Sequence, residues 1–179
     1  MLSLNIAFWM FMLIFALIGA MRGWAKELLV IFAVVTAVFM TFILEHHVPF
    51  VRDSQLFESE TSLFWLRASI LTAMVFFGYS TPSIPKLSEI SRFSQHSLES
   101  AMLGFFLGIL NGYMIVGTLW AYLDSAGYPF DIVSAPIAGT AAGDISLRMI
   151  PWFLPVWLTP PVIYFAVAGA FAIVIMLFL

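Results

Sequence analysis

The feature that most constrains this chain is a series of long apolar runs that carry almost no charge. A helix that crosses the hydrocarbon core of a bilayer needs about 20 such residues, and roughly 17–25 are tolerated. The runs of that length are residues 2–20, 28–44, 63–79, 101–123 and 161–179. Their apolar residues are continuous rather than alternating, which argues against membrane-spanning strands. The sequence therefore predicts an all-α integral membrane protein with about five transmembrane helices in a small bundle.

The scarcity of charge excludes several classes of protein. Only 9% of the residues are charged, whereas a soluble domain has about 25%. A net charge of −3 offers no basic surface for phosphates, so we expect no nucleic-acid partner. The chain has no cysteine, which removes disulfides, thiolate metal sites and cysteine nucleophiles. The lipid bilayer is the first partner that this composition predicts.

The connections between the runs divide the chain into three parts. Residues 1–125 hold the first four runs and are interpreted as a four-helix membrane core. Residues 126–160 are rich in Pro and Gly, and we expect an irregular extracytoplasmic or interfacial connection there. Residues 161–179 are interpreted as an additional C-terminal transmembrane helix. The link at residues 21–27 is so short that the first two helices should pack against each other as an antiparallel hairpin.

The segment between the third and fourth runs has a pattern of its own. Leu87, Ile90 and Phe93 recur there at helical spacing among charged residues. This spacing predicts a short amphipathic helix that lies in the membrane interface. A solvated loop whose apolar residues fall at that spacing by chance is the alternative.

The basic residues are spread unevenly between the two sides of the predicted bundle. One side has Arg22, Lys26, Lys86 and Arg92, and the other has Arg52, Arg67 and Arg148. Connections on the cytoplasmic side of a membrane carry an excess of Lys and Arg. The small majority favours an N-terminus outside and a C-terminus inside a multi-pass inner membrane.

A stripe of small residues marks the fourth run. It consists of Gly104, Gly108 and Gly112, with Asn111 on the same helical face. Small residues let helix backbones approach closely in lipid, so the stripe predicts a helix-packing seam across which Asn111 donates a hydrogen bond. A substrate pathway lined by Asn111 is the alternative. Gly169 and Ala170 belong to a looser small-residue surface on the last run, which we interpret as a seam for a partner.

Arg67 is the membrane-embedded charge, about one turn inside the third run. Ionisable residues within spans are costly and are functional candidates by default. Because the side chain of Arg67 is long, we expect its guanidinium to snorkel outward from the span, toward Glu58 or Glu60. The predicted spans hold no mid-membrane Asp, Glu, Lys or His, which argues against an ion-coupled transporter.

The residues that most suggest a metal or pigment site are His46 and His47, with Glu45 and Asp53 nearby, since imidazole is a common metal ligand. Adjacent histidines at a helix end point in different directions, so we interpret them as interfacial polar residues that close the span. The sequence also shows no nucleophile elbow, P-loop or helical two-His motif. We therefore predict no catalytic residue, no metal ligand and no cofactor.

The first hairpin resembles that of a known family. Residues 22–27 read Arg-Gly-Trp-Ala-Lys-Glu, which resembles the Arg-Gly-aromatic-x-basic-Glu signature of the colicin V production protein family. The motif residues are Arg22, Gly23, Lys26 and Glu27. The glycine stripe is similar to the Leu-Gly-x3-Gly-x2-Arg-Gly segment of that family. This chain has Glu99-Ser100 in place of the family's Asp-Arg pair and Asn111 in place of its arginine, and the resemblance covers about residues 2–125.

The resemblance implies a small bacterial inner-membrane protein with a four-helix core and a first hairpin that faces the cytoplasm. The family has no established catalytic activity and is associated with colicin export and with envelope and biofilm phenotypes. At the hairpin we expect Arg22 to reach anionic headgroups and Glu27 to meet the membrane surface at the positive end of the second helix. This hairpin is then a topological and docking element, with partner binding as the alternative.

Three hypotheses for the function follow. The leading one is a non-enzymatic membrane protein that acts through helix–helix contacts. It is either an accessory or structural subunit of a larger membrane complex or an envelope-associated member of the family, with other membrane subunits or a second copy as partner. The alternative is a small export component or channel related to toxin secretion. A membrane enzyme that uses a metal at His46 and His47 is the third.

Overall fold

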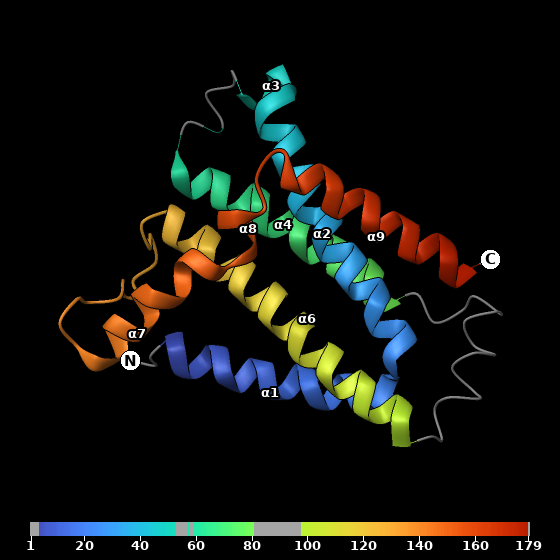
Figure 1. The fold of residues 1–179 in the computed structure, drawn as a ribbon. Coiled ribbons are helices and arrows are strands. Elements are labelled where there is room, and N and C mark those ends of the chain that lie inside the picture. The colour runs from blue at the N-terminus through green and yellow to red at the C-terminus, as the bar shows by residue number, and fades with distance from the viewer. Residues whose placement is uncertain (1–3, 53–56, 58, 81–97, 179) are drawn as a thin grey trace.

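The computed structural model describes residues 4–52, 57, 59–80 and 98–178. These residues form helices and connections without any strand, which confirms the predicted all-helical fold. In chain order the helices are α1 (Leu4–Arg22), α2 (Trp24–His47), α3 (Pro49–Arg52), α4 (Glu60–Ser80), α6 (Leu98–Ser125), α7 (Ala141–Met149), the 3-10 helix η2 (Ile150–Trp152), α8 (Leu154–Trp157) and α9 (Val162–Phe178) (Figure 1). The predicted interfacial helix around Leu87, Ile90 and Phe93 lies outside the described residues.

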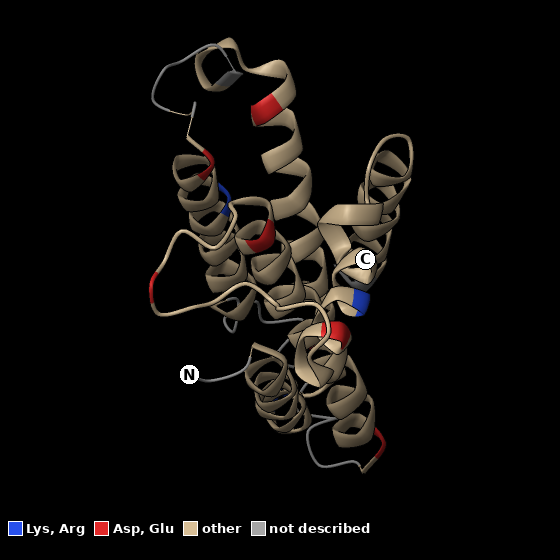
Figure 2. Ribbon diagram, turned by 90° about the vertical axis from the view of Figure 1, so that its left-hand side faces the viewer, with Lys and Arg blue, Asp and Glu red and all other residues tan. Residues whose placement is uncertain are grey.

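Four of the helices in the described part of the chain are long and apolar enough to cross a membrane, namely α1, α2, α4 and α6. The fifth predicted span is α9, whose 17 residues place it at the short end of the spanning range of roughly 17–25 residues. The number of spans is therefore roughly as predicted. Charged positions are few along the described part of the ribbon, as Figure 2 shows.

The arrangement of the helices differs from the sequence-based prediction in one respect. α1 packs along α6 for most of its length and touches α2 only slightly, whereas α2 packs against α4, α6 and α9 (Figure 1). The predicted side-by-side packing of the first two spans is therefore wrong. The reason is that the glycines of α6 let the backbone of α1 come close, whereas the larger side chains of α2 would hold α1 farther away.

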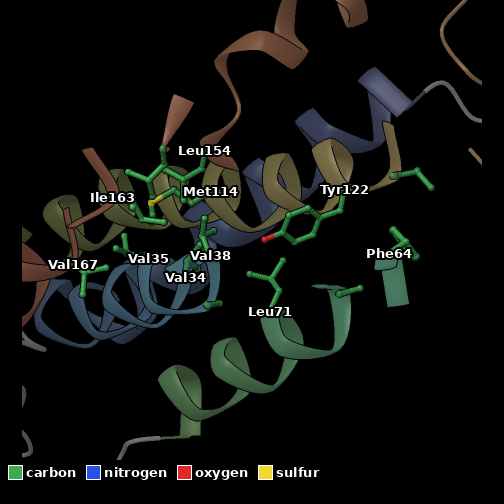
Figure 3. Packing of buried hydrophobic residues seen from close by; sticks show 14 residues of the cluster. Val34, Val35, Val38, Phe64, Leu71, Met114, Tyr122, Leu154, Ile163 and Val167 are labelled. Atoms are coloured by element: carbon green, nitrogen blue, oxygen red, sulfur yellow. The ribbon is translucent and has the colours of Figure 1, made fainter. Parts of the chain in front are cut away.

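The main hydrophobic core lies among α2, α4, α6, α8 and α9. Its members include Val34, Leu71, Met114 and Ile163, which point into the space between these helices (Figure 3). A smaller cluster joins α1 and α6 to the residue that follows η2. In it the ring of Phe8 lies 5.6 Å from that of Phe153, and both side chains are buried. The two clusters together hold the long helices and the short C-terminal ones in one bundle.

The connection after α6 is more ordered than predicted. The expectation of an irregular segment is wrong for α7, η2 and α8, which together cover most of residues 141–157. Thr140 caps α7, because its hydroxyl accepts a hydrogen bond from the backbone N–H of Gly143 at 3.1 Å. Asp144 lies in the first turn of α7, where its negative charge interacts favourably with the positive end of the helix dipole. A capping threonine followed by an acidic residue in the first turn is a local pattern that favours a helix start here.

Candidate functional site

Glu27 is a carboxylate buried completely inside the bundle, with 0% of its surface exposed. It lies in the first turn of α2, where unpaired backbone N–H groups favour negative charge. Arg22 Nη1 donates a hydrogen bond to Glu27 Oε1 at 2.6 Å, and Asn111 Nδ2 donates one to Oε2 at 2.8 Å. A buried charge is tolerated when it is paired and hydrogen-bonded, and both oxygens of this carboxylate are. The expectation that Glu27 meets the membrane surface is therefore wrong.

Arg22 ends α1 and turns its guanidinium inward, with 20% of the side chain exposed. Its Nη2 donates to the backbone oxygen of Tyr79 at 3.2 Å, near the end of α4. The guanidinium carbon also lies 4.3 Å from the centre of the Tyr79 ring, within the range of a cation–π contact. Arg22 therefore joins α1, α2 and α4 instead of reaching out to lipid headgroups.

Gly23 is the single residue between α1 and α2, and it has a φ of 83°. Side chains are disfavoured in this left-handed region, which is the physical reason for a glycine in the motif. Its N–H donates to the oxygen of Gly19 at 2.9 Å and so closes the end of α1. The tight turn places Arg22 and Glu27 on either side of it. Lys26, the other basic residue of the motif, is half-buried on α2.

Asn111 links the hairpin to α6. Besides its bond to Glu27 Oε2, its Nδ2 donates to the backbone oxygen of Glu27 at 3.0 Å, so both amide protons are used. Asn111 is fully buried, and among the described residues its Oδ1 accepts no hydrogen bond. An amide held in this way argues for a structural role and against a substrate pathway along this face. Sequence reasoning missed the pairing because Glu27 and Asn111 are 84 residues apart.

The glycine stripe of α6 lies directly on the backbone of α1. A Cβ placed on Gly104 would lie 2.2 Å from the oxygen of Gly19, and one on Gly108 would lie 2.3 Å from the oxygen of Phe15. A Cβ placed on Gly112 would lie 3.0–3.3 Å from atoms of Met12 and Phe15, a tight contact that these neighbours would have to relieve by a few tenths of an ångström. Real Cβ atoms do not approach a backbone as closely as 2.2–2.3 Å, so positions 104 and 108 accept only glycine without a shift of the helices.

The two small residues singled out on the last span have different surroundings. Ala170 is half-buried and packs against the main core. Gly169 is exposed, and a Cβ placed on it would meet no atom within 4 Å. The space beside Gly169 on α9 is therefore open, unlike the space beside the glycines of α6.

Arg67 forms a second ion pair at the opposite end of α2. Its Nε and Nη2 donate to Glu45 Oε1 and Oε2 at 2.6 and 2.9 Å, so the guanidinium binds the carboxylate with two parallel bonds. The prediction that Arg67 extends toward Glu58 or Glu60 named the wrong partner, because the guanidinium binds Glu45. Glu58 lies outside the described residues. α2 and α4 pack against each other in opposite directions, so the last turns of α2 lie beside the first turns of α4. This arrangement places Glu45 of α2 next to Arg67 of α4.

The histidines lie next to this second pair. His46 Nδ1 is 3.0 Å from the backbone oxygen of Phe42, and the His46 ring packs on the Phe42 ring with centroids 4.6 Å apart. His47 also contacts the Phe42 ring. Within the described part of the chain, no group of three or more His, Cys, Asp or Glu side chains is placed to hold a metal. Asp53 lies outside that part.

A bundle of apolar helices whose first hairpin is closed by a buried arginine–glutamate pair defines a small multi-pass membrane protein. The family model described as colicin V production protein matches residues 4–133, and the chain belongs to this family. The match confirms the resemblance carried by the hairpin motif and contains both ion pairs and the glycine stripe. No curated protein and no solved structure matches the chain.

Proposed function

We propose that this member of the family works without catalysis, as an accessory or structural subunit that binds another membrane protein through α9. The observation that carries the proposal is the position of α9. This helix lies beyond the family match at residues 4–133, and within the bundle it packs chiefly against α2. In Figure 1 it forms one edge of the bundle. A helix added at an edge is available to a neighbour on its free side.

The two sides of α9 differ. Ile163 and Val167 are buried against the bundle, and the ring of Phe171 packs edge-on against that of Phe32 at 4.9 Å. The other side presents Phe165 and Gly169, both exposed. Apolar side chains gain nothing by leaving lipid for another apolar surface, so association in a membrane depends on close packing at small residues. Gly169, flanked by larger exposed side chains, provides such a place.

The two ion pairs support a framework role rather than a catalytic one. The charged groups of Glu27 and Arg22 bind each other, and so do those of Glu45 and Arg67. Each pair joins different helices, so it stabilises the arrangement of the bundle.

Crosslinking tests the proposed partner surface. A photoreactive amino acid at position 169 is expected to give a discrete adduct in native membranes, because this position is open. The same residue at position 167 is the matched control, since Val167 faces the bundle and should react only within the chain. Mass spectrometry of the adduct identifies the partner, and an adduct with a second copy would show self-association. Absence of any intermolecular adduct at position 169 would refute partner binding through α9.

We also propose that the protein lies in a bacterial inner membrane with the hairpin end inside, the N-terminus outside and the C-terminus inside. The distribution of Lys and Arg supports this orientation, and the hairpin and the connection after α6 lie at opposite ends of α6. Because the chain has no cysteine, single cysteines report the orientation without background.

The residues best suited for the labelling are Met21 and Ile132, which are 82% and 88% exposed at the two ends. In intact spheroplasts an impermeant maleimide is expected to label Ile132→Cys and to leave Met21→Cys unlabelled until the membrane is opened. The reverse pattern would show that the orientation is inverted.

A further inference from the structure

A large apolar pocket lies away from the hairpin, between the first turns of α1, the middle of α6 and the segment formed by α7 and η2. Its volume is about 410 Å³, within the range of roughly 300–1,000 Å³ that is typical of ligand sites. Phe8 and Met12 contribute from α1, Tyr113 from α6, and Arg148 and Phe153 from the C-terminal segment. Except for Arg148 and the Tyr113 hydroxyl, these groups are apolar.

The pocket reaches from the membrane interface into the hydrocarbon region. Met12 lies about 12 Å along α1 from Leu4, at a rise of 1.5 Å per residue. Arg148 lies in the last turn of α7, within the connection that leads to the exposed Trp152. Exposed tryptophans are typical of the headgroup level of membrane proteins. The pocket therefore has its apolar part beside a spanning helix and its cation at the interface.

The Tyr113 hydroxyl on the pocket wall already has a hydrogen-bond partner. It donates to the backbone oxygen of Trp152, which also accepts a hydrogen bond from Nε1 of Trp157, a residue outside the pocket, at 2.9 Å. Arg148 is exposed, and among the described residues no carboxylate lies within ion-pair distance of it. An unpaired cation above an apolar pocket is complementary to an anion that carries a hydrocarbon chain.

We propose that this pocket binds an anionic phospholipid of the surrounding membrane. One acyl chain packs against Trp9, Met12 and Ile145, the pocket residues that keep accessible apolar surface. The phosphate accepts hydrogen bonds from the Arg148 guanidinium, which matches phosphate oxygens with its planar fork of donors. A phospholipid whose headgroup also carries a cationic amine places that charge near Arg148, and the repulsion lowers its affinity. The site therefore selects for headgroup charge at the interface and for chain packing below it.

Lipid retention by the purified full-length protein tests the proposal. The protein is reconstituted in nanodiscs with equal amounts of phosphatidylglycerol and phosphatidylcholine, extracted in mild detergent and examined by native mass spectrometry. The wild type is expected to retain phosphatidylglycerol in preference. In Arg148→Gln the preference should fall about tenfold, since a charge-assisted hydrogen bond is lost. Lys26→Gln is the matched control, because it removes one positive charge at the opposite end of the bundle.

A second variant locates the chain in the pocket. Ile145 lines the pocket and is 48% exposed, so Ile145→Trp fills the space with little effect on folding. This variant should retain less of both lipids. Equal retention of the two lipids by the wild type, equal behaviour of the Arg148 and Lys26 variants, or undiminished retention in Ile145→Trp would each overturn the proposal. Displacement of the bound phospholipid by an equimolar free fatty acid would overturn it as well.

Discussion

Replacing Glu27 with leucine is expected to lower the free energy of unfolding by about 3 kcal/mol, the lower end of the range for breaking a buried ion pair. The substitution leaves the Arg22 guanidinium without its counter-ion and removes the acceptor of one Asn111 proton. The effect belongs to the lower end because Arg22 is 20% exposed and can turn outward. Equilibrium unfolding in mixed micelles, followed by circular dichroism, measures the change.

Two variants separate the ion pair from a general effect of losing charge. Glu27→Gln keeps the shape of the side chain but presents an amide N–H₂ to one of the two donors, so its loss should lie between those of the wild type and the leucine variant. Glu99→Gln removes an exposed carboxylate from the first turn of α6 and should change the stability by less than about 0.5 kcal/mol. A leucine variant as stable as Glu99→Gln would show that the buried pair does not hold the hairpin.

Replacing Gly108 with alanine is expected to cost about 3 kcal/mol, the upper end of the range for overpacking a tight interface. The added methyl group would lie 2.3 Å from the backbone oxygen of Phe15, and a backbone cannot move aside as a side chain can. Relief requires a separation of α1 from α6, which also loosens the contacts of Gly104 with Gly19. The same unfolding measurement in mixed micelles gives the change.

Gly169→Ala is the control with the opposite expected sign. Nothing lies within 4 Å of its added methyl group, and alanine is favoured over glycine in a helix by roughly 0.5–1 kcal/mol. The Gly169 variant should therefore be at least as stable as the wild type. If Gly108→Ala and Gly169→Ala changed the stability equally, close packing of α1 on α6 would be refuted.

The hairpin has one feature that the sequence predicts and one that depends on the assembled bundle. The sequence shows the motif that runs from Arg22 and Gly23 to Glu27, and the positive φ of Gly23 explains why a glycine stands there. The sequence does not show the role of the two charged residues, because a glutamate at the start of a spanning helix is ordinarily expected at the interface. Its burial depends on Asn111, and no local pattern relates α2 to a residue 84 positions away.

The partner of Arg67, like the contact of Glu27 with Asn111, cannot be predicted from residues nearby in the sequence. The place of Arg67 inside a span was plain from the sequence, and so was its need for a partner. The sequence favours the acidic residues nearest to Arg67 along the chain, whereas the structure pairs Arg67 with Glu45 on α2. Two helices that run antiparallel bring together residues far apart along the chain, and that pairing prevails because both bonds of the planar fork are satisfied.

The sequence by itself determined that the chain is helical, that it spans a membrane and that α6 has a face of small residues. These properties follow from length, apolarity and helical periodicity, because lipid requires every spanning backbone group to bond within its own helix. Only the tertiary structure decided that α1 packs on α6 rather than α2, that Glu27 is buried and that α9 has a free side. In lipid the apolar faces of all helices are nearly equivalent, so the partners are chosen by close packing and by the few polar groups, which are properties of the assembled bundle.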